Sequence, residues 1–342
     1  PRRFVKQIPE SILQDPALNA AIALLPSNYS FEVHKSVHRV RSSSARRVAL
    51  QLPDGLLMYS LPLADILRSF VLAEPTYGAC CVDDLAAAAL DVDLLIHYGH
   101  SCLVPVSASR VPTLYVFVDI RIDVPRLVDV VVSNLALAGT VQFNSAVHAT
   151  RAVLVVVPQS KPLSAGEVLG CTAPTVVVFV ADGRFHLEAF MIANPGIKAF
   201  RYDPYLGVLF LEEYDHVGMK AARKDAIMVA KGAENWGIVL GTLGRQGSTR
   251  VLDRVMEERG TVVLMSEISP ARMELFADSV DAWVQIACPR LSIDWGEAFK
   301  KPLLTTFELE IALGLIPGWW EIYPMDYYAQ DGGDWNSSYA KN

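Results

Sequence analysis

The sequence predicts an α/β protein that consists of three similar repeat units with mainly parallel sheets. Its apolar residues gather in short stretches rich in Val, Ile and Leu, whose length and composition are typical of buried strands. Three of these stretches run into a polar, turn-rich loop, and each loop is followed by a segment with the pattern of a helix. Strands that alternate with helices indicate parallel sheets that are covered on both faces.

Each unit is expected to open with a strand that leads into a turn. The opening strands are predicted at residues 47–52, 152–157 and 236–240. Later strands of the same units are predicted at residues 93–97, 114–118, 175–180, 262–264 and 282–286. The unit boundaries that follow from this order are 1–145, 146–219 and 220–342, and the last unit includes a C-terminal tail.

The composition favours a globular protein over a membrane protein or a nucleic-acid-binding protein. The chain of 342 residues is 52% hydrophobic and has a formal net charge of -7. It has no basic block beyond a short stretch around Arg39, Arg41 and Arg47, whereas phosphate contacts need clustered Lys and Arg. It also has no secretory signal at its start and no apolar run of the roughly 20 residues that span a membrane. We therefore expect a cytoplasmic protein that binds neither nucleic acid nor a membrane.

The five cysteines are widely scattered and odd in number, which is unlike the disulfide framework of a small secreted domain. Each predicted unit carries one cysteine beside a small or turn-forming residue, namely Cys80, Cys171 and Cys288. Ligands of open α/β sheets bind beyond the carboxyl ends of the strands, where three thiolates could meet. Thiolates are the usual ligands of iron–sulfur clusters. The spacing alone leaves open the alternative of unrelated packing residues.

A second pattern follows the predicted strand 93–97. His97, His100 and Cys102 occur there at the close spacing of a zinc site, and Cys81 adjoins Cys80. Histidines at strand ends often serve as hydrogen-bonding groups instead, so both interpretations stay open at this point.

Two further segments are candidates for binding an amino-acid substrate. The loop 241–247 has the spacing Gly-x-x-Gly-x-x-Gly, and its backbone could approach an anion at a helix N-terminus. This spacing differs from the dinucleotide fingerprint, which argues against a nicotinamide-dependent dehydrogenase. Arg290 and Asp294, which follow Cys288, could grip the carboxylate and the amine of an amino acid. The alternatives are a plain tight turn and an ion pair that pins a loop.

A set of segments spread over nearly the whole chain resembles one known family. The segments are residues 21–29, 52–56, 77–84, 97–102, 169–172, 182–188, 201–205, 241–247, 287–296 and 323–328. On these motifs the chain is identified as a member of the family of diphthamide biosynthesis protein 1, the eukaryotic catalytic subunit of 2-(3-amino-3-carboxypropyl)histidine synthase. The motifs occur in the family's order, and together they are highly specific.

The resemblance implies a cofactor and a site. It implies three α/β units arranged around a central 4Fe–4S cluster, with one ligand each from Cys80, Cys171 and Cys288 and none from Cys81 or Cys102. It implies a radical S-adenosylmethionine enzyme that lacks the usual local run of cysteines and has no side-chain catalysts beyond the cluster ligands. The candidate contacts to S-adenosylmethionine are then Gly244, Gln246, Gly247, Arg290 and Asp294.

The resemblance also implies a reaction and partners. The family transfers a 3-amino-3-carboxypropyl group from S-adenosylmethionine to a histidine of translation elongation factor 2, as the first step of diphthamide biosynthesis. The expected partners are a related second subunit, diphthamide biosynthesis protein 2, in a heterodimer, and a small metal-binding protein that donates electrons. The alternative function is a non-catalytic iron–sulfur scaffold or an electron-relay subunit of the same complex.

Overall fold

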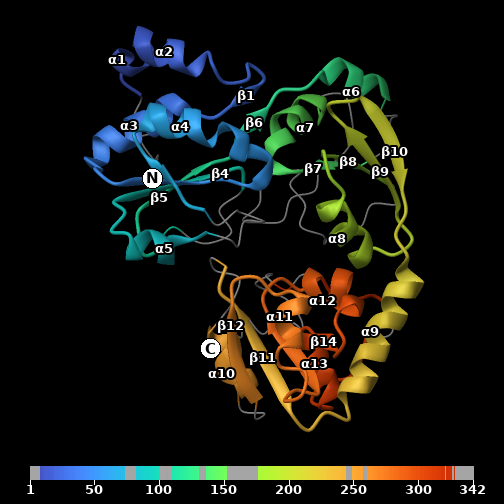
Figure 1. Ribbon diagram of the computed structural model, residues 1–342. Helices are drawn as coiled ribbons and strands as arrows, with labels where there is room; N and C mark the ends of the chain where they lie inside the picture. Colours follow the sequence, from blue (N-terminus) through green and yellow to red (C-terminus); the bar gives the residue numbers. More distant parts are fainter. Residues whose placement is uncertain are drawn as a thin grey trace, which may run out of the picture. The chain divides into compact units, whose positions relative to one another are not determined.

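The structure is a computed structural model that describes residues 8–73, 82–100, 106, 109–130, 136–151, 176–243, 249–256, 260–319, 321–325 and 327. Within these residues the fold is mixed α/β, with three four-stranded sheets and one two-stranded sheet (Figure 1). The chain divides into two compact units: Pro1–Glu167, Val178–Asp182 and Tyr202–Leu209 form the first, and Val168–Val177, Gly183–Arg201 and Phe210–Asn342 the second. The predicted boundaries at residues 145 and 219 stay a prediction. Across the described part of the chain, no helix has the length and apolar character needed to cross a membrane.

The N-terminal sheet consists of parallel strands in the order β3-β2-β4-β5. Successive side chains of a strand point to opposite faces of its sheet. Val48 and Leu50 therefore pack with helices α3 and α4, whereas Ala49 packs with α5 on the other face. Burial on both faces explains why the central strands are continuously apolar. The bounds are β2 (Val48–Gln51), β3 (Phe70–Val71), β4 (Leu94–Tyr98), β5 (Thr113–Val116), α3 (Val33–Ser43), α4 (Ser60–Leu67) and α5 (Asp84–Ala89).

The C-terminal sheet is also parallel, in the order β12-β11-β13-β14. Ile238 and Val284 belong to the core under helices α9, α10 and α13, whereas Trp283 faces the opposite side with α11. Helix α12 follows β13 directly. The bounds are β11 (Trp236–Gly241), β12 (Gly260–Met265), β13 (Ala282–Ile286), β14 (Leu303–Leu304), α9 (His216–Ala230), α10 (Thr249–Met256), α11 (Pro270–Glu274), α12 (Arg290–Trp295) and α13 (Thr306–Ala312).

These two sheets share more than their strand order. In both, the second strand in sequence lies at an edge, and the first and third strands are paired at the centre. The Asp93 carboxylate, just before β4, accepts hydrogen bonds from the backbone N–H groups of Arg46 and Arg47 at 2.8 and 2.9 Å. Asp281, just before β13, does the same for Glu234 and Asn235 at 3.2 and 2.9 Å. The backbone bonds lower the pKa of both carboxyl groups. The same connection at equivalent places supports a repeat relation between these two sheets.

The middle sheet has a different order, β10-β9-β8-β7, in which each described strand neighbours the next in sequence. A turn at residues 204–207 joins β9 to β10, and Gly207 takes a positive φ of 63° there, which glycine adopts without strain. The predicted strand 152–157 lies outside the described residues, so a third repeat is not confirmed. The bounds are β7 (Ala136–Gly139), β8 (Val176–Val180), β9 (Lys198–Asp203), β10 (Val208–Glu212), α6 (Val124–Val130), α7 (Asn144–Arg151) and α8 (Phe185–Ala193).

The remaining described elements are short. Strands β1 (Tyr29–Ser30) and β6 (Asp119–Ile120) pair antiparallel. The others are α1 (Glu10–Leu13), α2 (Pro16–Ile22) and the 3₁₀ turns Asp54–Tyr59, Val141–Phe143 and Gly296–Ala298.

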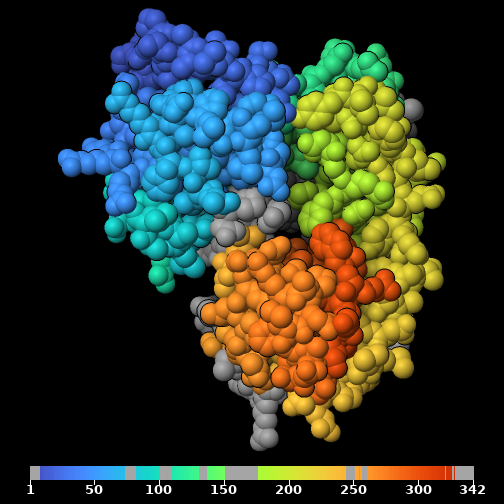
Figure 2. Space-filling model, viewed as in Figure 1, coloured from blue at the N-terminus to red at the C-terminus, as the bar shows by residue number. Residues whose placement is uncertain are grey.

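Helix α9 is amphipathic and carries Arg223, a residue of the candidate site. In the space-filling view its residues, coloured gold, lie at the surface along the helix (Figure 2). Val217, Met228 and Val229 are among its exposed side chains. Its buried residues recur at intervals of three or four and are Met219, Arg223, Ile227 and Ala230. Arg223 is the charged member of this buried face, so it needs buried partners.

Candidate functional site

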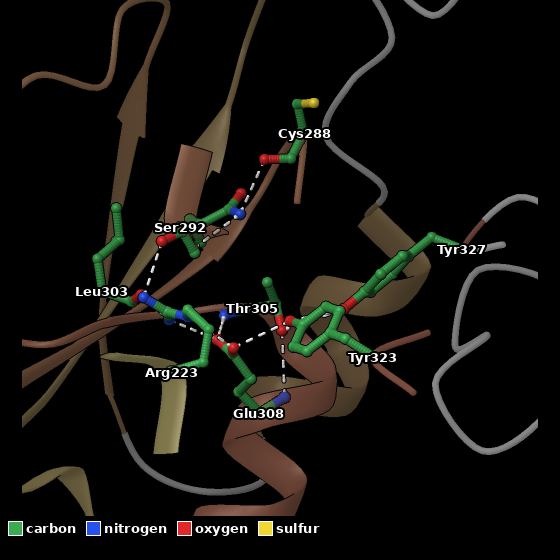
Figure 3. Close-up of polar contacts among 9 residues, drawn as sticks. Arg223, Cys288, Ser292, Leu303, Thr305, Glu308, Tyr323 and Tyr327 are labelled. Carbon is green, nitrogen blue, oxygen red and sulfur yellow. Dashed lines mark hydrogen bonds and ion pairs between the residues drawn. The ribbon is translucent and has the colours of Figure 1, made fainter. Parts of the chain in front are cut away.

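Arg223 is clamped by acceptors from three other segments of the C-terminal sheet unit (Figure 3). Its side chain is 1% exposed, and Glu308, its ion-pair partner on α13, is 0% exposed. The Arg223 Nε and Nη2 groups donate to the two Glu308 carboxylate oxygens at 2.8 and 2.6 Å. Nη2 also donates to the Leu303 carbonyl at 2.8 Å, and Nη1 donates to the Ser292 carbonyl at 2.7 Å. Burial opposes the charge on Arg223, but Glu308 more than compensates and raises its pKa.

Glu308 joins this clamp to the start of α13 and to the C-terminal segment. It forms a capping box with Thr305, whose side chain accepts the Glu308 N–H while Glu308 accepts the Thr305 N–H. Tyr323 donates its hydroxyl to Glu308 at 2.9 Å, and the hydroxyls of Tyr323 and Tyr327 are 3.2 Å apart. Burial, followed by the Glu308 charge, raises the pKa of both tyrosines, so they stay protonated as donors. A buried charge pair with all these partners is held rigidly, and it limits the movement of the neighbouring loop between β13 and α12.

Cys288 lies on that loop, between the end of β13 and the start of α12 (Figure 3). Its carbonyl oxygen accepts two hydrogen bonds at 3.0 Å, one from the Leu291 N–H and one from the Gln285 side chain. The same Gln285 amide nitrogen lies 3.2 Å from the Ser292 hydroxyl. Cys288 is a partly exposed residue, and it forms no disulfide with any residue the structure describes. A held backbone with a partly exposed cysteine is suited to binding a metal.

Arg290, two residues after Cys288, is a buried cation that joins α12 to α8. Its Nε donates to both Asp294 carboxylate oxygens at 2.8 Å, and its Nη2 donates to Glu188 at 2.8 Å. Its Nη1 donates to the Phe185 carbonyl at 2.7 Å, and the guanidinium lies 4.4 Å from the centre of the Phe185 ring. Burial raises the pKa of Asp294, and Arg290 opposes that rise. Both residues therefore have structural partners already. Within the described part of the chain, these bonds and the 2.7 Å ion pair between Nη2 and Asp294 use every Arg290 donor except one Nη1 hydrogen.

A second polar cluster lies at the carboxyl ends of β2 and β4 in the N-terminal sheet. The Gln51 side-chain oxygen accepts the backbone N–H of Asp83 at 3.1 Å and lies 2.9 Å from His97 Nδ1. Because the Asp83 N–H identifies that atom as the oxygen, His97 Nδ1 must carry the proton. His97 Nε2 is then an acceptor, and it has no hydrogen-bond partner among the described residues. Burial lowers the pKa of His97 to about 4, so the ring is neutral near pH 7.

Replacing His97 with Gln is expected to reduce the acid sensitivity of the fold. The folded pKa of about 4 lies below the ordinary value of 6.5, so the unfolded chain binds more protons between these values. The stabilisation from the neutral ring is complete above about pH 6.5 and is lost as the pH falls to about 4, a loss of about 3 kcal/mol. Urea unfolding at pH 7, 5.5 and 4 should therefore show a shallower decline for His97→Gln. The exposed His148→Gln is the matched control and should follow the parent protein; a His97→Gln curve parallel to the parent's would contradict the assignment.

The structure brings together some of the predicted site residues and leaves others undescribed. Cys288, Arg290 and Asp294 lie on one segment, the loop after β13 and the helix α12 that follows it. The other predicted residues, Cys80, Cys81, Cys102, Cys171, Gly244, Gln246 and Gly247, lie outside the described residues. His97 and His100 have ring centres 6.1 Å apart, but the described residues contain no group of three metal-binding side chains. The sequence interpretation did not identify Gln285 or Glu188, although a glutamine inside the apolar strand 282–286 was an available signal.

Comparisons with known proteins point to one family. The family model of diphthamide synthesis proteins matches residues 52–324. The 2-(3-amino-3-carboxypropyl)histidine synthase subunit 1 of Gallus gallus is 51% identical, over 99% of this chain and 90% of that protein. The same subunit of Homo sapiens is 49% identical, over 99% of this chain and 84% of that protein. The crystal structure of Dph2 from Pyrococcus horikoshii with a 4Fe–4S cluster has a TM-score of 0.67 at 24% identity, covers 85% of this chain and 92% of that one, and thus has a similar fold.

Proposed function

The chain belongs to the diphthamide synthesis protein family, and we propose that it is a transferase subunit that acts in the first step of diphthamide biosynthesis. The proposed reaction moves a 3-amino-3-carboxypropyl group from S-adenosylmethionine to a histidine of translation elongation factor 2. The main support is the similarity to subunit 1 of the histidine synthase over nearly the whole chain. The geometric support is the segment after β13, which combines a partly exposed cysteine with a buried Arg and a partly buried Asp.

We propose that Cys80, Cys171 and Cys288 hold a 4Fe–4S cluster. Of the three, Cys288 lies in the described part of the chain, and its features fit a ligand: a soft thiol, partial exposure and a carbonyl held by two donors. Three protein thiolates leave one iron of such a cluster without a protein ligand. When bound, the cluster supplies the electron that breaks a carbon–sulfur bond of S-adenosylmethionine.

The chain's own residues then bind and orient the substrate. The proposed contacts are Gly244, Gln246 and Gly247 of the loop after β11, together with Arg290 and Asp294. Asp294 already pairs with Arg290, so it would act mainly by orienting the guanidinium. One Nη1 hydrogen of Arg290 has no acceptor among the residues that the structure describes, and it is the donor proposed for the substrate carboxylate. Orientation decides which of the three carbon–sulfur bonds is broken, so it is the main task of these residues.

The proposed partners follow from the same function. The designation subunit 1 of its relatives supports a multi-subunit complex, and we propose a heterodimer with diphthamide biosynthesis protein 2. The protein substrate is elongation factor 2, and a small metal-binding protein donates electrons. All of these partners act in the cytoplasm.

Iron and sulfide analysis of the protein purified without oxygen tests this proposal. We expect about four irons and four sulfides per chain, with the visible absorption of a 4Fe–4S cluster that bleaches on reduction. Zinc in place of iron would contradict the cluster and would favour the interpretation based on His97, His100 and Cys102. A cluster-loaded chain that binds no S-adenosylmethionine, in a complex that still modifies elongation factor 2, would favour the scaffold or electron-relay function.

Replacing Arg290 with Ala is expected to weaken S-adenosylmethionine binding and to leave the cluster absorption unchanged. The substitution removes a charged donor and leaves Glu188 without its buried cation, so affinity should fall roughly tenfold and the unfolding temperature should also drop. Equilibrium binding to the cluster-loaded protein measures the first effect. Arg184→Ala is the control, because Arg184 also pairs with Glu188, at 3.3 Å, but is far more exposed. Normal affinity in a destabilised Arg290→Ala protein would give Arg290 a purely structural role.

A further inference from the structure

We propose that Gln285 is a positioning residue for Cys288, which it holds through the Cys288 carbonyl. The inference rests on the proposed function, since it takes Cys288 as a cluster ligand. Gln285 is the penultimate residue of β13 and is 2% exposed. Its amide nitrogen contacts the Cys288 carbonyl in the loop at 3.0 Å and the Ser292 hydroxyl in helix α12 at 3.2 Å.

The chemistry of the Cys288–Pro289 peptide makes this contact important. Proline has no N–H group, so the carbonyl of Cys288 is the hydrogen-bonding group of that peptide. The carbonyl accepts the Leu291 N–H, which closes the turn, and the Gln285 amide, which ties the turn to the sheet. Pro289 takes a φ of -59°, within the narrow range that its ring allows. The Cys288 backbone is therefore fixed on both sides, and Gln285 supplies its link to β13.

Helix α12, which follows the loop, is held by Arg223 of helix α9. Ser292, the second partner of Gln285, gives its own carbonyl to Arg223 Nη1 at 2.7 Å. Arg223 is in turn held by both carboxylate oxygens of Glu308. A series of buried and partly buried contacts thus runs from the Arg223–Glu308 clamp through Ser292 and Gln285 to the Cys288 carbonyl. Figure 3 shows Arg223, Glu308, Ser292 and Cys288 of this series. The bond from Gln285 to the Cys288 carbonyl ties the cysteine directly to β13, and the bond to Ser292 is a second, indirect link to the clamp.

The polarity of Gln285 is not explained by the sheet. The other residues of β13 are apolar, and an amide buried among them costs free energy unless its groups are hydrogen-bonded. The nitrogen of the amide is satisfied only by the Cys288 loop, and its oxygen has no hydrogen-bond partner among the residues described. An apolar side chain would therefore be more favourable in the strand itself. The role that only the glutamine can serve is to hold the Cys288 carbonyl. Partners just outside the ligand shell usually orient the ligands of a metal and tune its properties.

Gln285→Leu is the test variant, because it keeps a similar volume and removes both donated hydrogen bonds. Ser292→Ala removes the Ser292 hydroxyl but leaves the bond from Gln285 to Cys288. Val284→Ala is the control for stability, because Val284 is fully buried and faces the opposite side of the same strand. Two measurements are made. One is the rate at which iodoacetamide alkylates Cys288 in cluster-free protein, followed by peptide mass spectrometry; the other is the reduction potential and iron retention of the reconstituted protein.

We expect Gln285→Leu to alkylate roughly fivefold faster at Cys288 than the parent, because a carbonyl with one donor holds the thiol less firmly. In the reconstituted protein it should lose iron to a chelator roughly tenfold faster and show a shifted potential. Ser292→Ala and Val284→Ala should stay within about twofold of the parent in both measurements, even where Val284→Ala lowers the unfolding temperature more. Equal alkylation rates in Gln285→Leu and Val284→Ala would overturn the inference. If no chain binds iron, the proposed function fails, while the alkylation rates still decide whether Gln285 positions Cys288.

Discussion

Replacing Cys288 with Ala is expected to leave a folded protein that binds almost no iron and has no transferase activity. Cys288 is partly exposed and does not belong to the apolar core clusters described for its sheet, so its side chain should add little to stability. The loss of iron binding should be much larger than the loss of stability, because the cluster needs all three protein thiolates together. Cys80→Ala and Cys171→Ala should behave alike. Iron and sulfide content, visible absorption and group transfer to elongation factor 2 measure the effect.

Two other cysteines provide matched controls for this experiment. Cys81→Ala and Cys102→Ala change the same chemical group, and Cys81 is the immediate neighbour of Cys80. Both variants should keep most of the iron and the activity. Loss of the cluster in Cys81→Ala together with its retention in Cys80→Ala would show that the assigned ligand is wrong. Iron retained in all three ligand variants would show that the cysteines serve only in packing.

The strands were predictable because burial on both faces requires continuous runs of apolar residues, which can be seen in the sequence. The predicted strands at 236–240, 262–264 and 282–286 coincide with β11, β12 and β13 to within two residues at each end. Their order in the sheet was not predictable in the same way, because it depends on how helices pack between strands. The middle sheet illustrates this: its strands have the expected composition but a different described order from the two parallel sheets.

The candidate site was predictable as a segment but not as a set of contacts. An ion pair between Arg290 and Asp294 was one of the two interpretations of the segment after Cys288, and the two side chains are bonded to each other. Glu188, the other partner of Arg290, lies 102 residues away in the sequence, and a pairing over that distance follows from the tertiary fold alone. The sequence holds weak signals for Arg223 and Glu308. Arg223 is a cation on the apolar face of a helix, and Glu308 is the glutamate of a capping box. Nothing in the sequence joins the two.

The reduced protein, in complex with its partner subunit, is expected to release 5′-methylthioadenosine when it modifies elongation factor 2. The reasoning begins with the ligand pattern, because the chain has no local run of three cysteines. Ligands from three distant segments build a different substrate pocket, in which the aminocarboxypropyl carbon of the sulfonium can face the electron source. One electron breaks that carbon–sulfur bond, and the electron pair stays on sulfur as the thioether of 5′-methylthioadenosine. The three-carbon fragment, a radical, then forms a bond to an imidazole carbon. The adduct returns one electron to the oxidised electron source and loses the proton of that carbon to solvent, which restores the aromatic ring.

The nucleoside product and the need for a reductant test different parts of this reaction. 5′-Methylthioadenosine identifies the bond that breaks, whereas dependence on dithionite identifies a radical route, because a polar transfer would give the same nucleoside without a reductant. An imidazole carbon is a poor nucleophile for polar transfer, so we expect turnover without oxygen to fall to background when dithionite is omitted. Elongation factor 2 with its target histidine replaced by Ala is the control and should remain unmodified. 5′-Deoxyadenosine as the main product, or equal turnover without reductant, would contradict the mechanism even if the cysteine ligands were confirmed.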